Sequence, residues 1–183
     1  PDYLDQQQLS SIGHPICRNL DIFLSGENWV RETFYKHSKR YDLSLIEGAM
    51  GLFDGLGPTH ISSTANVAKV LNLPVILIIN AKGQVGSLLA LFKGFKDLDK
   101  NIAIKGIVFN NINSKRHEML IREVFKNQPV KLLGFLPFNE NINLSHGRLG
   151  LLSPNEVDKR INVNYFADFA QKHLNFSLLL NFL

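Results

Sequence analysis

The chain has a single cysteine, Cys17, among its 183 residues. One thiol excludes an internal disulfide framework and fits a reducing compartment. The sequence also has no apolar run long enough to cross a membrane and no stretch that resembles a signal peptide. It has no internal repeat or low-complexity segment either. We therefore expect a globular cytoplasmic protein that does not associate with membranes.

Strong charge of one sign is also lacking, because 20 basic and 16 acidic residues give a formal net charge of +4. The basic residues are scattered, with adjacent pairs at Lys39-Arg40, Lys115-Arg116 and Lys159-Arg160. This pattern is a weak signal for nucleic acid, and an anionic small molecule satisfies it as well. With 45% hydrophobic residues, the chain suits a single domain with a proper core.

Hydrophobic periodicity predicts helices that alternate with buried strands. Short apolar runs, bounded by turn residues, predict the strands: Leu43 to Ile46, Val75 to Ile79, Ile102 to Phe109 and Val130 to Leu136. Helical spacing predicts the helices: Glu27 to His37, Ser62 to Leu71, Gly86 to Phe95, Ser114 to Lys126 and Pro154 to Leu174. Strands and helices in this order predict an α/β fold with a doubly wound, mostly parallel sheet and helices on both faces.

Ligands of such sheets bind beyond the carboxyl ends of the strands. Four places where polar residues or glycine follow a predicted strand qualify: Glu47 to Asp54, Asn80 to Gly86, Asn110 to Asn113, and Pro137 to Asn139. The sequence IEGAMGLFDG, Ile46 to Gly55, places two carboxylates and three glycines directly after an apolar run. A carboxylate there either is paired or holds a metal or a polar ligand.

Carboxylates also stand at Asp2 and Asp5 in the opening PDYLD. Hard oxygen ligands of this kind suit Mg²⁺, which bridges one or two carboxylates to substrate phosphates. On spacing alone, Asp2 and Asp5 are better explained as solvated residues at a terminus, and for Glu47 a helix cap and a metal ligand are equally good explanations. The histidines His60, His117 and His146 lack partners at metal-ligand spacing, and we expect them at the surface.

Several segments together resemble one family. In chain order they are PDYLD, RNLD at Arg18 to Asp21, IEGAMGLFDG, SSTANVAKVLNLPVILIINAKG from Ser62 to Gly83, KGIVFNNI from Lys105 to Ile112, LLGFLP from Leu132 to Pro137, and RLGL at Arg148 to Leu151. This series is similar to the cobyrinic acid a,c-diamide synthases, glutamine-dependent amidoligases of cobalamin biosynthesis. More distantly it resembles dethiobiotin synthetase and other P-loop ATPases.

The resemblance implies a synthetase domain that phosphorylates a substrate carboxylate with ATP and Mg²⁺, after which glutamine-derived ammonia displaces the phosphate. It implies catalytic roles for Asp2, Asp5 and Asp54 and a Mg²⁺-associated role for Glu47. It places Tyr3 and Leu4 at the substrate. By similarity to dethiobiotin synthetase it places Asn110 and Pro137 beside the nucleotide base. The substrate is cobyrinic acid or a related tetrapyrrole, and a homodimer is compatible with the family.

The sequence departs from the family pattern in two ways. It contains no strand followed by a glycine-rich GxGxGK[ST] phosphate loop, and Lys82-Gly83 has the wrong order and spacing. It also contains no glutaminase nucleophile, because Cys17 lacks the elbow that such a cysteine needs. We therefore expect an N-terminally truncated synthetase domain over residues 1–152, followed over 153–183 by a closing helix and the start of a linker towards an absent glutaminase domain. We expect this chain alone to be inactive.

Two other functions stay open. A nucleotide-dependent switch of the ParA or MinD kind would bind partners instead of making a product, but such switches carry no PDYxD element ahead of an EGxMGLxDG loop. An inactive, truncated scaffold is the third possibility.

Overall fold

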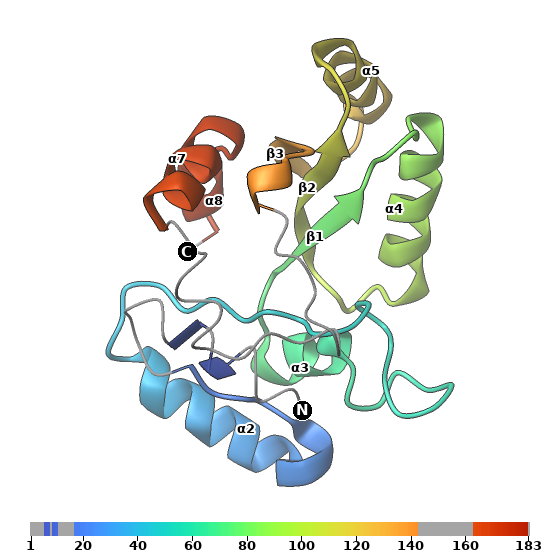
Figure 1. Ribbon diagram of the computed structural model, residues 1–183. Helices are drawn as coiled ribbons and strands as arrows, with labels where there is room; N and C mark the ends of the chain where they lie inside the picture. The colour runs from blue at the N-terminus through green and yellow to red at the C-terminus, as the bar shows by residue number, and fades with distance from the viewer. Residues whose placement is uncertain (1–5, 8, 11–16, 143–162, 183) are drawn as a thin grey trace, which may run out of the picture. The chain divides into compact units, whose positions relative to one another are not determined.

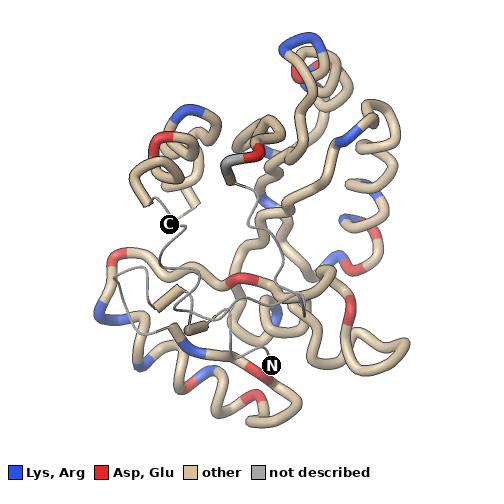
Figure 2. The backbone as a smooth tube through the Cα atoms, in the orientation of Figure 1, with Lys and Arg blue, Asp and Glu red and all other residues tan. Residues whose placement is uncertain are grey.

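The computed structural model describes residues 6, 7, 9, 10, 17–142 and 163–182. These form two compact units, the first made of residues 1–72 and 144–163 and the second of residues 73–143 and 164–183. Figure 1 traces both units, and Figure 2 shows basic and acidic residues interspersed along the described backbone, as the sequence predicts. Among the described residues, no helix has both the length and the apolar character needed to cross a membrane.

The first unit contains two helices, α2 (Ile22–Ser38) and α3 (Thr64–Leu71). The side chain of Asp21 caps α2 by accepting a hydrogen bond from the Leu24 N–H at 2.9 Å. Gly26 breaks the helix with φ +76°, a conformation open to glycine, so α2 is a single turn followed by a longer segment. The predicted helix from Glu27 to His37 is that longer segment.

The predicted strand from Leu43 to Ile46 is wrong, because these residues have no regular secondary structure and Leu45 is 83% exposed. A strand needs a neighbour whose N–H and C=O groups complete its hydrogen bonds. In the described part of the chain, only three segments pair into a sheet, and this segment is not among them. Its apolar residues alone were therefore an insufficient signal.

The second unit is built on a parallel sheet of β1 (Val75–Asn80), β2 (Ile104–Ile112) and β3 (Lys131–Pro137), in that spatial order. Three predicted strands are thereby confirmed within a few residues. Helices α4 (Gly86–Leu98) and α5 (Lys115–Phe125) connect them, as predicted, and Ser114 caps α5 through the His117 N–H at 3.1 Å. This α/β arrangement confirms the predicted fold class.

Aromatic rings form the core between the sheet and the two connecting helices. Phe109 of β2 lies 5.1 Å from the ring of Phe125 in α5 and 5.5 Å from that of Phe135 in β3. Phe92 of α4 completes the cluster at 5.8 Å from Phe125. Burial of these rings is the main source of stability for this unit.

Helices α7 (Val163–His173) and α8 (Phe176–Leu180) pack on β3. The Asn175 N–H donates to the Leu133 carbonyl at 2.7 Å, and Leu174 bridges to Gly134. Helix α7 confirms the later part of the predicted closing helix, whereas residues 154–162 lie outside the described residues. The apolar stretch that follows forms α8, where no helix was predicted.

Strand β1 has a free edge, since it pairs with β2 alone in the described sheet. We predicted that this strand would be covered on both faces, but Ile78 is 71% exposed. Leu77 and Ile79 are buried on the opposite face. Among the described residues, β1 is covered on one face only, and Ile78 is exposed on the other.

Candidate functional site

The predicted site residues fall into three groups. Asp2, Tyr3, Leu4 and Asp5 lie outside the described residues. Glu47 and Asp54 lie in the first unit, on what we call the acidic loop, residues 46–55. Asn110 and Pro137 lie in the second unit, where β2 and β3 end.

The acidic loop is held against the beginning of α3 by backbone hydrogen bonds. The Ala65 N–H donates to the Leu52 carbonyl at 2.8 Å, and the Leu56 N–H donates to the Ile61 carbonyl at 2.9 Å. Leu52 and Phe53 are buried, so two apolar side chains anchor the centre of the loop. The loop is therefore a fixed element although it lacks regular secondary structure.

Its glycines permit this close packing. A Cβ atom on Gly55 would lie 2.3 Å from the Ile61 carbonyl oxygen, and one on Gly48 would lie 2.6 Å from Oγ1 of Thr64. No side chain fits at such distances unless the neighbouring atoms move. The glycines at these two places are thus explained by packing against the segment that leads into α3.

A polar turn between the loop and α3 completes the structure. His60 contacts the Phe53 carbonyl through Nδ1 at 2.9 Å, and its ring meets the Phe53 ring edge-on. Ser63 is buried; its hydroxyl donates to the His60 carbonyl at 2.7 Å and accepts from the Asn66 N–H at the start of α3. His60 is exposed, as predicted, and Ser63 is the predicted helix cap.

Glu47 and Asp54 are both exposed on this fixed loop. Among the described residues, neither takes part in an ion pair. The described part of the chain also holds no cluster of three or more potential metal ligands. Two hydrated carboxylates on one loop do not make an all-protein cage, but they fit Mg²⁺, which keeps several waters and takes its remaining ligands from phosphates.

In the second unit, Asn110 and Pro137 lie at the same edge of the sheet. Asn110 pairs with Leu136, and Ile112 pairs with Pro137, so the two predicted residues belong to neighbouring strands at matching height. The Asn110 side-chain oxygen accepts from the Asn111 N–H at 2.9 Å. This bond fixes the orientation of the Asn110 amide at the carboxyl end of the sheet, where ligands of such folds bind.

Further amides surround Asn110. The Asn111 side chain donates to the Asn80 side-chain oxygen at 3.1 Å, which also accepts from the Lys82 N–H at 3.1 Å. Asn111 itself has φ +60°, a left-handed conformation that asparagine tolerates better than most residues. The ends of β1 and β2 are thus joined by side-chain hydrogen bonds, and no strand pattern in the sequence predicted this connection.

His117 corrects a sequence prediction, because it is only 8% exposed and does not lie at the surface. Its Nδ1 accepts from the Asn113 N–H at 3.2 Å, and its Nε2 lies 2.7 Å from the Gln84 carbonyl. These two bonds suit a neutral ring with the proton on Nε2. His117 therefore joins the loop after β1 to the loop after β2. In the sequence, the only indication of this role was the position of His117 three residues after Ser114, which caps α5.

Comparison with known proteins gives a family and several curated relatives. The model of the AAA domain family matches residues 15–145. Cobyrinate a,c-diamide synthase of Caldanaerobacter subterraneus subsp. tengcongensis is 36% identical over 169 residues, which are 90% of this chain and 37% of that protein. The enzyme of the same name from Gloeobacter violaceus is 37% identical, covering 98% of this chain and 40% of its own length.

A third relative, the cobyrinate a,c-diamide synthase of Limosilactobacillus reuteri, is 39% identical over 99% of this chain and 41% of its own length. The chain thus spans about two fifths of these curated relatives. No solved structure gives a significant match. The chain belongs to the AAA domain family, with a P-loop NTPase-like α/β fold, and along most of its length it is similar to cobyrinate a,c-diamide synthases.

Proposed function

We propose that this chain is the synthetase part of a ligase that converts the a and c carboxylates of cobyrinic acid, or of a closely related tetrapyrrole, into amides. The observation that carries the proposal is the 36–39% identity to relatives of that name over nearly the whole chain. The exposed carboxylates of the acidic loop and the fixed amides at the carboxyl edge of the sheet support it.

The proposed chemistry overcomes the poor electrophilicity of a carboxylate. An oxygen of the substrate carboxylate attacks the γ-phosphorus of ATP, the bond to the β-phosphate oxygen breaks, and ADP leaves. Ammonia derived from glutamine then attacks the carbonyl carbon of the acyl phosphate. The amide forms as inorganic phosphate departs and the nitrogen loses a proton. Each amide therefore consumes one ATP and one ammonia.

In this proposal Glu47 holds Mg²⁺, directly or through its waters, and Asp54 lies beside the reacting phosphate. Mg²⁺ neutralises charge on the transferred phosphoryl group when it is bound. Both carboxylates are exposed on a loop fixed by Leu52 and Phe53, so they reach a ligand without rearrangement of the core. Asp2 and Asp5 act near the phosphates and the substrate, and Tyr3 and Leu4 contact the substrate.

Asn110 and Pro137 border the nucleotide base in this proposal. The Asn111 N–H donates to the oxygen of the Asn110 side chain, so this bond fixes the orientation of the amide. The amino group of the same amide is then available as a donor to the base. Proline has no N–H of its own, so Pro137 offers the base a carbonyl and an apolar ring. Residues 1–152 form the synthetase region and 153–183 the closing segment. The protein acts in the cytoplasm, on small molecules, and as a homodimer.

A nucleotide switch of the ParA or MinD kind is the competing proposal, and substrate dependence separates the two. We would measure ADP release by the full-length protein, with Mg²⁺, ATP and glutamine, in the presence and absence of cobyrinic acid. A synthetase releases ADP only when the tetrapyrrole is added. Equal ADP release with and without the tetrapyrrole would favour the switch. No ADP release under either condition would favour an inactive scaffold.

A further inference from the structure

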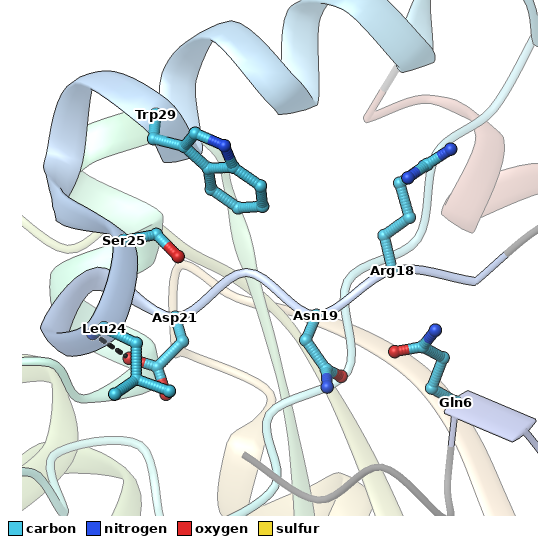
Figure 3. A pocket seen from close by; sticks show the side chains of 7 residues that line it. All are labelled: Gln6, Arg18, Asn19, Asp21, Leu24, Ser25 and Trp29. Atoms are coloured by element: carbon cyan, nitrogen blue, oxygen red, sulfur yellow. Dashed lines mark hydrogen bonds between the residues drawn. The ribbon is translucent and has the colours of Figure 1, made fainter.

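A pocket of about 250 Å³ opens in the first unit beside the segment Arg18 to Asp21 (Figure 3). Gln6, Ser25 and Trp29 also line it. In the view of Figure 3, Trp29 and the Arg18 guanidinium lie on one side of this segment, and the Asn19 and Gln6 amides lie on the other. The pocket is separate from the acidic loop in sequence, and none of the predicted site residues lines it.

The polar lining contains hydrogen-bond donors that are not used within the described structure. The Nδ2 atom of Asn19 is buried and has no hydrogen-bond partner among the described residues. Arg18 is exposed, and within the described ranges it forms no ion pair. A buried donor without a partner destabilises a protein unless a ligand or water satisfies it. These donors favour a ligand group rich in acceptors.

Basic residues lie near Arg18 at the end of α2, and the pocket lining also includes the Asp21 carboxylate, which caps α2. Partial burial, and then the charges of Arg18, Arg40 and Lys36, lower the pKa of His37 at the end of α2. Such a shift is expected where a proton would add to an existing cluster of positive charge. An anionic group is attracted to this region, and a carboxylate also suits the bidentate geometry of the Arg18 guanidinium.

Apolar side chains also line the pocket. Trp29 is 46% exposed and Leu24 is 60% exposed, so both present hydrocarbon surface to a ligand. The break at Gly26 separates them, because Leu24 belongs to the single turn before the break and Trp29 to the helix after it. A ligand that carries a carboxylate on an apolar body matches a wall of this kind next to Arg18 and Asn19.

The volume limits how much of a ligand enters. Pockets that enclose a whole small molecule measure roughly 300–1,000 Å³, and this one is about 250 Å³. It therefore suits one arm of a large ligand better than the macrocycle itself. Gln6 connects the pocket in sequence to the preceding PDYLD segment, for which substrate contacts were predicted.

We infer that this pocket binds one carboxylate-bearing side arm of the tetrapyrrole substrate, with Arg18 on the carboxylate and Trp29 against the apolar part. The inference rests on the proposed function, and it deepens it by assigning substrate recognition to residues outside the acidic loop. An arm held here is one that is not being amidated, so the pocket helps to decide which carboxylate reaches the phosphate.

The test is equilibrium binding of cobyrinic acid to the full-length protein and to three variants. Arg18→Gln removes the charge and the paired donors, and Arg18→Lys keeps the charge alone. Arg40→Gln is the matched control, since it removes the same charge from the same surroundings without lining the pocket. Thermal unfolding of each variant checks that the fold is retained, as expected for exposed side chains.

We expect the Kd of cobyrinic acid to rise about tenfold or more in Arg18→Gln, because a charge-assisted hydrogen bond to a carboxylate is lost. Arg18→Lys should weaken binding less, and Arg40→Gln should stay within about twofold of the wild type. If Arg18→Gln does not fold, the comparison of Arg18→Lys with Arg40→Gln decides, and the inference expects the larger loss of binding in Arg18→Lys.

Equal binding by Arg18→Gln and the wild type would overturn the inference and leave the proposed function standing. An equal loss of binding in Arg40→Gln would also overturn the inference, because the overall positive charge of the region would then account for the effect. If the wild type itself does not bind cobyrinic acid, both the proposed function and the inference fall.

Discussion

At the scale of single residues, the acidic loop combines a fixed backbone with unpaired carboxylates. Glu47 is exposed and has no ion-pair partner among the described residues, so its charge contributes little to stability. The role proposed for Glu47 is in ligand binding and not in the stability of the fold. Substitution of Glu47 should therefore lower the activity of the protein and leave its stability almost unchanged.

We predict that Glu47→Gln changes the free energy of unfolding by less than about 0.5 kcal/mol, as for other exposed substitutions. Tetrapyrrole-dependent ADP release should fall roughly 100-fold, the size of effect seen when one electrostatic group is removed from a reacting centre. Glu32→Gln, an exposed glutamate on α2, is the control and should retain activity. A fully active Glu47→Gln enzyme would remove Glu47 from the site.

Some residue assignments could not come from the sequence. A histidine near a helix cap is usually exposed, whereas His117 is buried because Gln84 and Asn113, from two different loops, satisfy both of its nitrogens. The link between Asn80 and Asn111 likewise depends on strand register. Asn110 and Pro137 lie at the carboxyl ends of neighbouring strands, and their role beside a nucleotide base stays a prediction from the resemblance.

At the scale of elements, strands β1 to β3 were predictable from short apolar runs, and α3 and α5 from their serine caps. The segment from Leu43 to Ile46 has the same kind of composition but forms no strand. The difference is a pairing partner, which composition does not reveal. Ile78, on the edge strand β1, is exposed although Leu77 and Ile79 are buried, because successive side chains of a strand point to opposite faces of the sheet.

Two glycines test how α7 and α8 pack on β3. A Cβ atom on Gly134 would lie 2.8 Å from the His173 carbonyl oxygen, whereas one on Gly94, in α4, would meet nothing within 4 Å. We predict that Gly134→Ala destabilises the protein by about 1–3 kcal/mol through overpacking. Gly94→Ala should stabilise it by up to about 1 kcal/mol through helix propensity.

Urea unfolding of the two glycine variants gives both values. Equal effects of the two substitutions on stability, or no effect of Gly134→Ala, would contradict the close contact of His173 and Leu174 with Gly134. The prediction concerns the second unit alone, because both glycines and their neighbours belong to it.

At the scale of the whole molecule, the two units present different chemistry. The first carries the acidic loop and the pocket beside Arg18, and the second carries the amides at the carboxyl edge of the sheet. The relatives extend well beyond the aligned part, since the chain spans 37–41% of their length.

The most direct measurement is the mass spectrum of cobyrinic acid after incubation with the full-length protein, Mg²⁺, ATP and glutamine. The account predicts a product with two carboxylates converted into amides, at positions a and c, and predicts that this product is absent without ATP. Unchanged cobyrinic acid, in a sample of folded protein that consumes ATP, would contradict the central claim.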